Sequence, residues 1–359
     1  MLPRSPHFIS MSISRAVISS FLLLAVSFYF YAHYTSNAAV NGVTTSSIFH
    51  PEDPSSPTTQ SNGQSDRQIA QQPCPLVSPQ LTGWTNLSSE AMAAILQEDQ
   101  MTVESKMEAA GLKMGGRYQP EDCRSPHKVA IVVPVRDRKD HLTVFLRYMH
   151  PFLQRKQLDY IIIVVEQSDG LPFNRGMLMN VGFKEAQLLN ETFDCFILHD
   201  VDMLPEHDGN PYTCPEVGKP RQMAFALDYF KNYSSVGEGF FGAVTAISAD
   251  DFGRINGLAN SFWDWGGEDE NFYHRVVSQH LKVVRPFDGQ SSVLVHYKMQ
   301  SHKRAVPSPN RLDVMKEGFN RFKTDGLVNL RYKIIDYQSK LLNTHILVDF
   351  QRDNVTVAS

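Results

Sequence analysis

Cysteine is scarce in this 359-residue sequence, and none of its four copies forms a CxxC pair. A zinc ribbon or a thioredoxin-type motif is therefore not expected. Basic residues are not in excess, because the formal net charge is −4, so a nucleic acid is not an expected partner. The sequence also lacks a GxxxxGKS/T phosphate loop and an HExxH pair, which argues against a P-loop enzyme and a metal-dependent hydrolase.

The N-terminal region predicts a membrane anchor and a flexible stem. Residues 16–34 carry no charged side chain and are long enough to cross a bilayer, and Arg4 and Arg15 precede them. The positive-inside rule then places residues 1–15 in the cytosol and the remainder in a lumen, although a cleaved signal peptide is the alternative. Residues 35–73 are rich in Ser, Thr, Gln and Pro and are expected to form a stem, with a globular lumenal domain at 74–359.

Cysteine pairing and glycosylation signals agree with a lumenal location. An even cysteine number behind a membrane segment favours two disulfides, and four buried free thiols are the alternative. Four N-x-S/T sequons are candidate glycosylation sites: Asn86, Asn190, Asn232 and Asn354.

The globular part alternates apolar strands with helical segments. Strands are predicted at 129–135, 160–165 and 195–198, and helices at 88–110, 139–154 and 174–189. Further strands are expected at 223–227, 242–248, 282–285 and 345–350. Strands of near-continuous Val and Ile indicate an α/β fold with a mostly parallel, Rossmann-like sheet flanked by helices. Ligands of such sheets bind beyond the carboxyl ends of the strands.

An Asp-Val-Asp triplet at 200–202 follows the third predicted strand directly. Two carboxylates at this position suit a hard divalent cation beside a diphosphate. Such a cation would stabilise a departing nucleoside diphosphate. The alternative is an ordinary solvated turn.

Residues 262–271 combine two tryptophans, two glycines and several acids (FWDWGGEDEN). The adjacent glycines suit a mobile lid, and Asp269 is a candidate general base for a hydroxyl. The alternative is that the acids simply begin a helix, where they complement its dipole. That alternative does not explain the paired tryptophans.

Other polar side chains follow the predicted strands. Arg136 and Arg138 come after the first strand and Arg175 after the second, where they suit a phosphate or a uracil ring, with surface ion pairs as the alternative. His302 is a candidate metal ligand, whereas Met299 is a poor match for a hard cation by its softness.

These motifs together resemble the β-1,4-galactosyltransferase family, glycosyltransferase family 7. The similarity covers about residues 74–350 and is carried by seven stretches: VAIVVPVRDRKDHL, FNRGMLMNVGF, FILHDVDMLP, FFGAVTAIS, FWDWGGEDENF, KMQSH and PSPNR. The resemblance implies a GT-A fold in one catalytic domain, inversion at the anomeric carbon, a Golgi membrane location and disulfides Cys74–Cys123 and Cys195–Cys214.

The resemblance also implies roles for individual residues. Asp269 would be the catalytic base, and Mn²⁺ would be held by Asp202, Met299 and His302. Residues for a UDP-sugar donor would be Pro134, Val135, Arg136, Arg138, Phe173, Arg175, Asp200, Val201, Phe240 and Trp265. Residues for an N-acetylglucosamine-terminated acceptor would be Gly267, Glu268, Asp269, Glu270, Arg311, Leu312 and Met315. The segment from about 296 to 311 would be a long loop that folds over the donor.

Position 240 bears on the donor sugar. Vertebrate galactosyltransferases of the family have Tyr where this chain has Phe240, and members that use UDP-N-acetylgalactosamine carry a smaller residue. Because Phe keeps the ring, we expect galactose as the donor sugar, with N-acetylgalactosamine as the alternative. A non-catalytic sugar-binding protein of the same fold is the alternative from another functional class.

Overall fold

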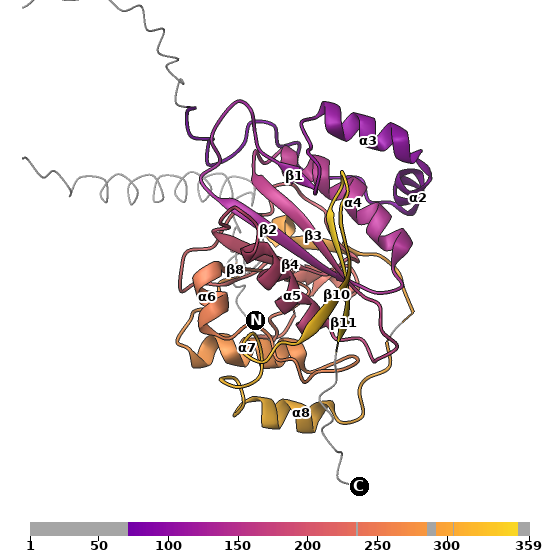
Figure 1. The fold of residues 1–359 in the computed structure, drawn as a ribbon. Coiled ribbons are helices and arrows are strands. Elements are labelled where there is room, and N and C mark those ends of the chain that lie inside the picture. The colour runs from indigo at the N-terminus through magenta and orange to yellow at the C-terminus, as the bar shows by residue number, and fades with distance from the viewer. Residues whose placement is uncertain (1–70, 235, 286–291, 304, 351–359) are drawn as a thin grey trace, which may run out of the picture. The chain divides into compact units, whose positions relative to one another are not determined.

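The computed structural model describes residues 71–350 except residues 235, 286–291 and 304 (Figure 1). The predicted cytosolic tail and anchor, nearly all of the predicted stem and the sequon at Asn354 lie outside the described residues. Among the described residues, no helix is both long enough and apolar enough to span a bilayer. Residues 72–73, expected in the stem, pair with Arg124 next to Cys74.

A twisted sheet of eight strands forms the centre of the domain (Figure 1). Its order is β10 (Tyr332–Ser339), β11 (Thr344–Phe350), β3 (Asp159–Gln167), β2 (Lys128–Val135), β4 (Cys195–His199), β8 (Val244–Ser248) and β6 (Arg221–Gln222), and β1 (Arg117–Tyr118) also pairs with β3. β11, β3, β2 and β4 pair parallel with one another, whereas the outer strands β10, β8, β6 and β1 pair antiparallel with their neighbours. The expectation of a mostly parallel sheet is therefore correct for its four central strands and wrong for the strands around them.

Both faces of the sheet are buried because successive side chains of a strand point to opposite sides. Along β2, Val129, Ile131 and Val133 join one core and Ala130 and Val132 join the other. The first core packs against α4 (Lys139–Gln154), behind which lie α2 (Ser89–Gln97) and α3 (Gln100–Ala109). The second core packs against α5 (Arg175–Gln187), α6 (Ala249–Arg254) and α7 (Glu268–Ser278).

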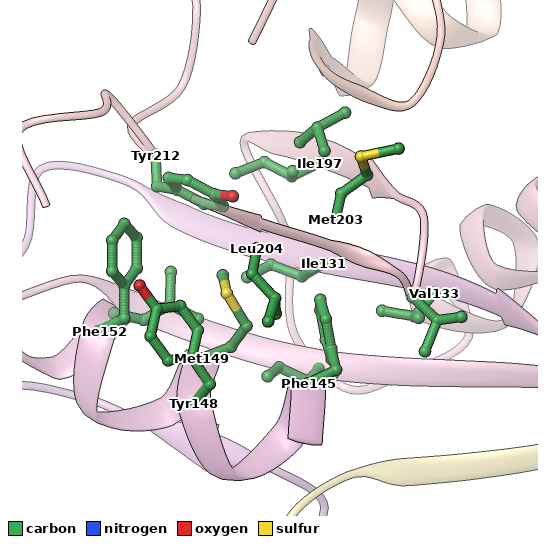
Figure 2. Close-up of a cluster of buried hydrophobic side chains, with 14 of the residues drawn as sticks. Ile131, Val133, Phe145, Tyr148, Met149, Phe152, Ile197, Met203, Leu204 and Tyr212 are labelled. Atoms are coloured by element: carbon green, nitrogen blue, oxygen red, sulfur yellow. The ribbon is translucent and has the colours of Figure 1, made fainter. Parts of the chain in front are cut away.

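Figure 2 shows how α4 contributes to the first core. Phe145 and Met149 project from the helix toward Ile131 and Val133 of β2, and Phe152 lies against Tyr212. These spacings of three and four residues are those of one helix face. All six side chains are fully buried.

A small second sheet lies beside the first and carries part of the predicted site. It consists of β5 (Met203–Pro205), β9 (His296–Met299) and β7 (Ala226–Leu227), with β9 in the middle. Met203 pairs with Met299 across β5 and β9. This pairing brings the segment after residue 299 next to the Asp-Val-Asp triplet.

Several predicted elements are correct and others are wrong. The structure confirms one predicted helix, at 139–154, and four predicted strands, at 129–135, 160–165, 195–198 and 345–350. It also confirms Asn174 as an N-cap, because its Oδ1 accepts a hydrogen bond from Met177 N at 2.9 Å. The helix at 88–110 is two helices, because Asp99 caps the second by accepting from Thr102 N. Of the strand expected at 223–227, only Ala226–Leu227 forms a strand, β7, and β6 ends just before it in a different sheet. At 282–285 there is only an isolated bridge from Val284 to Arg221, and β10 was missed.

Both implied disulfides are present. Cys74 bonds to Cys123 and Cys195 bonds to Cys214, so the alternative of free thiols is wrong. Three sequon residues, Asn86, Asn190 and Asn232, are exposed.

Candidate active site

The candidate site lies where β4 ends. Asp200 follows the last residue of β4, and its N–H donates to the carbonyl of Ala243 at 2.9 Å. Because β8 runs antiparallel to β4, β8 begins where β4 ends, and residues 242–243 therefore lie beside Asp200. The acidic first turn of α7 reaches the same place, since Asp269 lies against Gly242.

Arg175 joins the two principal carboxylates of the site. Its Nε donates to Asp200 Oδ1 at 2.6 Å, and one terminal nitrogen donates to Asp269 Oδ1 at 2.9 Å. Burial by itself would lower the pKa of Arg175, but the charges of Asp200 and Asp269 outweigh burial and raise that pKa. Arg175 is therefore permanently charged and holds residues from β4 and α7 in one cluster.

The same environment changes the carboxylates. Burial raises the pKa of Asp200 to about 6. Burial also raises the pKa of Asp269 well above its ordinary value, the charges of Glu268 and Asp200 add to this, and Arg175 opposes it. A carboxylate with a raised pKa is a stronger base, which suits Asp269 to accepting a proton from a hydroxyl.

Gly242 makes the position of Asp269 possible. A Cβ on Gly242 would lie 2.1 Å from both Cγ and Oδ1 of Asp269. The Gly242 peptide is held in place by Gln222, which donates to its carbonyl at 2.9 Å and accepts from its N–H at 3.2 Å. Neither residue was predicted from the sequence to belong to the site.

The glycines around Gly242 match the letters of a dinucleotide motif. Residues 237–242 read GEGFFG, a GxGxxG spelling. The motif requires a strand before the glycines and a helix after them. Here the segment runs directly into β8, so it is not a dinucleotide-binding turn.

Asp202 and His302 meet at the edge of the second sheet. His302 Nε2 lies 2.8 Å from Asp202 Oδ2. The carbonyl of Asp202 accepts from Gln300 N at 2.7 Å, which ties the segment after Met299 to the Asp-Val-Asp turn. Hydrogen bonding to Asp202 raises the pKa of His302, and Arg138 lies 3.4 Å from its Nδ1.

Asp202 supplies an oxygen donor and His302 a nitrogen donor, and this pair of donors fits a divalent metal. Nδ1 of His302 lies 2.9 Å from the carbonyl of Lys303, and a proton on Nδ1 would leave Nε2, the nitrogen beside Asp202, free to bind a metal. Such a backbone partner typically fixes the tautomer of a metal-binding histidine. Met299, at the end of β9, belongs to the same strand edge. Among the described residues, no group of three or more His, Cys, Asp or Glu side chains is placed to hold a metal ion.

The residues predicted to bind the donor fall into two groups. Arg136 lies over the Phe173 ring at 5.2 Å and donates to the carbonyl of Leu171 at 2.5 Å, which provides a flat cationic and aromatic surface. Pro134, Val135 and Val201 are buried at strand ends, so their side chains contribute to packing. Phe240 is half-buried near the start of β8.

The tryptophan loop contacts the segment that leads into α8 (Arg311–Gly318). Trp265 forms a bridge with Pro307, and its carbonyl accepts from Ser308 N at 3.0 Å. Arg311 covers the loop closely, since a Cβ on Gly266 would meet its Cδ at 2.8 Å. Gly267 has φ of 97° and begins α7, so the acids at 268–270 form a helix start and also border the site. The two interpretations of residues 262–271, as part of a site and as the start of a helix, are therefore compatible.

Most predicted acceptor residues lie around this loop contact. Glu268, Asp269 and Glu270 occupy the first turn of α7, and Arg311 packs over Gly266 and Gly267. Leu312 is 56% exposed, and Met315 follows one turn later on α8. The structure thus places the residues predicted for the acceptor on two adjoining helix N-termini.

Comparison with known proteins identifies the family. A profile described as the N-terminal region of glycosyl transferase group 7 matches residues 74–215, and one described as the N-terminal domain of galactosyltransferase matches residues 221–303. The chain belongs to glycosyltransferase group 7.

Curated relatives of this group 7 chain are β-1,4-galactosyltransferases. It is 40% identical over 282 residues to β-1,4-galactosyltransferase 1 of Homo sapiens, covering 77% of this chain and 66% of that protein. It is 38% identical to β-1,4-galactosyltransferase 4 of Homo sapiens, covering 81% of each. The chain therefore spans slightly less than two thirds of the first of these relatives.

A solved structure has the same fold. The catalytic domain of Drosophila β-1,4-galactosyltransferase 7 in complex with xylobiose superposes with a TM-score of 0.56 at 30% identity, covering 63% of this chain and 95% of that one. A mutant of the same enzyme was solved in complex with manganese, UDP-Gal and xylobiose, with the same TM-score and identity. The group 7 chain thus shares its mixed α/β fold with a galactosyltransferase.

Proposed function

We propose that this chain is an inverting, manganese-dependent hexosyltransferase. It transfers galactose from UDP-galactose in β-1,4 linkage to a terminal N-acetylglucosamine of a glycoprotein or glycolipid glycan. The observation that carries this proposal is the cluster in which Arg175 joins Asp200 and Asp269 next to the Asp202–His302 pair. Relatives in glycosyltransferase group 7 support the choice of galactose.

Asp269 acts as the base in this proposal. Its raised pKa favours removal of a proton from the acceptor hydroxyl as that oxygen attacks the anomeric carbon. Arg175 fixes the direction of the carboxylate through the 2.9 Å bond to Oδ1, and we propose that Oδ2 takes the proton. The backbone of Gly242 limits movement of the carboxylate from the other side.

Asp202, Met299 and His302 would hold the manganese ion, which would neutralise charge on the departing UDP. The Arg136–Phe173 pair suits the uracil ring, and Arg138 next to His302 suits a phosphate oxygen. Each of these side chains follows the end of a central strand or belongs to the β9 edge, where ligands of α/β sheets bind.

Phe240 supports galactose as the donor sugar. Its ring lies near the start of β8, two residues before the glycine that contacts Asp269. A bulky ring at this position leaves less room for an N-acetyl group. Turnover of UDP-galactose and UDP-N-acetylgalactosamine should be compared side by side; a large excess with the latter would overturn the choice of donor.

The decisive test of catalysis is Asp269→Asn in the full-length chain. Transfer to N-acetylglucosamine should fall by about 1,000-fold or more, because the amide cannot accept the proton. UDP binding in the presence of manganese, measured by calorimetry, should remain. A sugar-binding protein without catalytic activity would show no transfer before the substitution either. Exhaustive chelation should abolish transfer, and added manganese should restore it.

The membrane topology is part of the proposal and rests on the sequence. Residues 16–34 would anchor the chain as a single-pass protein of the Golgi membrane with the catalytic domain in the lumen. Exposed Asn86, Asn190 and Asn232 are available for N-glycosylation on that side. Glycosidase treatment of the chain expressed in cells should reduce its apparent mass, and the absence of any shift would contradict lumenal exposure.

A further inference from the structure

Three buried aromatic side chains form a row of hydrogen bonds behind the Asp-Val-Asp turn. They are His199, the last residue of β4, Tyr212 in the loop that follows β5, and Tyr297 in β9. Nε2 of His199 lies 2.8 Å from the hydroxyl of Tyr212, and the hydroxyl of Tyr297 donates to that same oxygen at 3.1 Å. All three side chains are fully buried, so water does not compete for these bonds. None of the roles assigned above uses them.

One end of this row holds the backbone of Asp200. Nδ1 of His199 lies 2.9 Å from the carbonyl of Asp200, and because a carbonyl can only accept, Nδ1 carries a proton. Burial lowers the pKa of His199 to about 4, so the ring is neutral near pH 7 and its Nε2 accepts. Tyr212 therefore donates to His199, and Tyr297 donates to Tyr212. Every bond in the row has one direction and one partner.

The carbonyl of Asp200 is the point where the Asp-Val-Asp turn begins. The N–H of Met203, the first residue of β5, donates to it at 3.2 Å and closes the turn. The bond from His199 is a second bond to the same oxygen, so it fixes the Asp200 peptide where the chain leaves the main sheet. Because Asp202 lies within this turn, the direction of its carboxylate depends on that peptide.

The other end of the row belongs to the strand that leads to His302. Tyr297 and Met299 are two residues apart in β9, so their side chains lie on the same face of the strand. β4 belongs to the main sheet and β9 to the second sheet, and among the described strands none pairs with both. The row of hydrogen bonds therefore joins the two sheets, and each sheet carries one side of the predicted metal site.

The rings in this row are held on several sides. Phe145 of α4 lies edge-on to His199, with ring centres 4.9 Å apart. Figure 2 shows Phe145 and Tyr212 in the first core. Tyr212 also lies two residues before Cys214, whose disulfide to Cys195 ties its loop to the start of β4. A lost hydroxyl in this row cannot be replaced by rotation of a neighbouring ring.

We propose that His199, Tyr212 and Tyr297 are positioning residues for the metal site. Their hydrogen bonds hold the Asp-Val-Asp turn against β9 and keep the two sides of the site at the spacing that a divalent cation requires. The inference rests on the metal site of the proposed function and extends it to side chains that touch neither metal nor substrate. Outer hydrogen-bond partners of metal ligands change metal affinity by about 10- to 100-fold when they are removed.

Tyr212→Phe in the full-length chain is the main test, because it keeps the ring and removes the hydroxyl at the centre of the row. It leaves Nε2 of His199 and the hydroxyl of Tyr297 without each other's link. Binding of Mn²⁺ alone, followed by the electron paramagnetic resonance signal of the free ion, should weaken by about tenfold. Tyr297→Phe removes only the outer bond and should weaken Mn²⁺ binding by about threefold.

Tyr160→Phe is the matched control. The hydroxyl of Tyr160 lies 2.8 Å from Nδ1 of His150, whose Nε2 lies 2.7 Å from the carbonyl of Leu342, so the same type of buried hydrogen bond is lost. Tyr160 is near the start of β3, which runs parallel to β2 and β4, so it lies at the opposite edge of the sheet from the site. Urea unfolding should show a loss of stability in both variants, but Tyr160→Phe should bind Mn²⁺ as the wild-type chain does.

The outcomes separate this inference from the proposed function. The inference is wrong if the wild-type chain binds no Mn²⁺, if Tyr212→Phe binds Mn²⁺ as tightly as the wild-type chain, or if Tyr160→Phe weakens binding as much. Tyr297→Phe decides by the same criteria if Tyr212→Phe does not fold. A wild-type chain that binds Mn²⁺ but transfers no sugar would overturn the proposed function, whereas weaker Mn²⁺ binding by Tyr212→Phe would still support the inference.

Discussion

Replacing Gly242 with alanine is the sharpest test of the geometry around the proposed base. The new Cβ would lie 2.1 Å from Oδ1 of Asp269, whereas ordinary contacts begin at 3.4 Å, so the carboxylate must move by about 1.3 Å. Movement of the opposing backbone is resisted by the two hydrogen bonds between the Gly242 peptide and the Gln222 side chain. The carboxylate would therefore leave Arg175, to which Oδ1 is bonded at 2.9 Å.

A misplacement of about 1 Å can cost about 100-fold in rate, so kcat/KM for transfer should fall by about that factor. UDP and manganese binding should change little, because Asp202 and His302 are not displaced. Gly239→Ala is the matched control, since a Cβ at that position meets no atom within 4 Å. The reasoning is refuted if Gly242→Ala retains transfer within threefold of the wild-type chain, or if Gly239→Ala loses as much.

Three further predictions concern pH and stability. The acid limb of the pH profile of kcat/KM should have its midpoint well above pH 3.8, because Asp269 must be deprotonated to act and burial raises its pKa. A midpoint near pH 3.8 would argue against Asp269 as the base. Burial lowers the pKa of His150 from 6.5 to about 4, so as the pH falls the unfolded chain takes up a proton before the folded chain does. The free energy of unfolding should therefore fall by about 3 kcal/mol between pH 6.5 and 4 because of this residue. Urea unfolding of His150→Gln should show a correspondingly weaker dependence of the free energy of unfolding on pH. Asn174→Ala removes the hydrogen bond from Met177 N and leaves the carbonyl of Asn260 without its donor. The free energy of unfolding, measured by urea titration, should fall by about 2 kcal/mol. A loss of under about 0.5 kcal/mol would show that water replaces both hydrogen bonds.

The central strands were predictable because they are buried on both faces. Continuous Val and Ile in β2 and β3 give a strong signal, and α4 has an equally clear apolar face. The direction of β8 was not predictable, since a strand that is buried on both sides has the same composition whether it runs parallel or antiparallel. The short strands β6 and β7 have only two residues each, too few for any periodicity to be recognised.

The strand β10 was missed for a different reason. Its residues are mostly exposed, including Ile334 at 39% and Ile335 at 44%, so its sequence lacks the alternation expected of a half-buried strand. Pairing with β11 stabilises it in the fold. Its position at the edge of the sheet cannot be read from local composition.

The candidate site was partly predictable. Asp200, Asp202 and Asp269 were found because carboxylates next to strand ends and glycines stand out in the sequence. The role of Arg175 in joining Asp200 to Asp269 was not predicted. It depends on contact between the end of β4 and the start of α7, which are more than 60 residues apart in the sequence. Gly242 was not found either, since a close approach between a backbone and a side chain leaves no trace in composition. The available signals were the run of glycines before β8 and the FFGAVTAIS stretch, which contains Gly242.

The bridge between Trp265 and Pro307 has a kinetic consequence. The carbonyl of Trp265 holds Ser308, and Arg311 rests on the neighbouring glycines, so the two segments share their hydrogen bonds and packing although about 40 residues separate them. Neither segment can rearrange without breaking contacts of the other. We therefore expect this side of the domain to open in one concerted step that separates Trp265 from the start of α8.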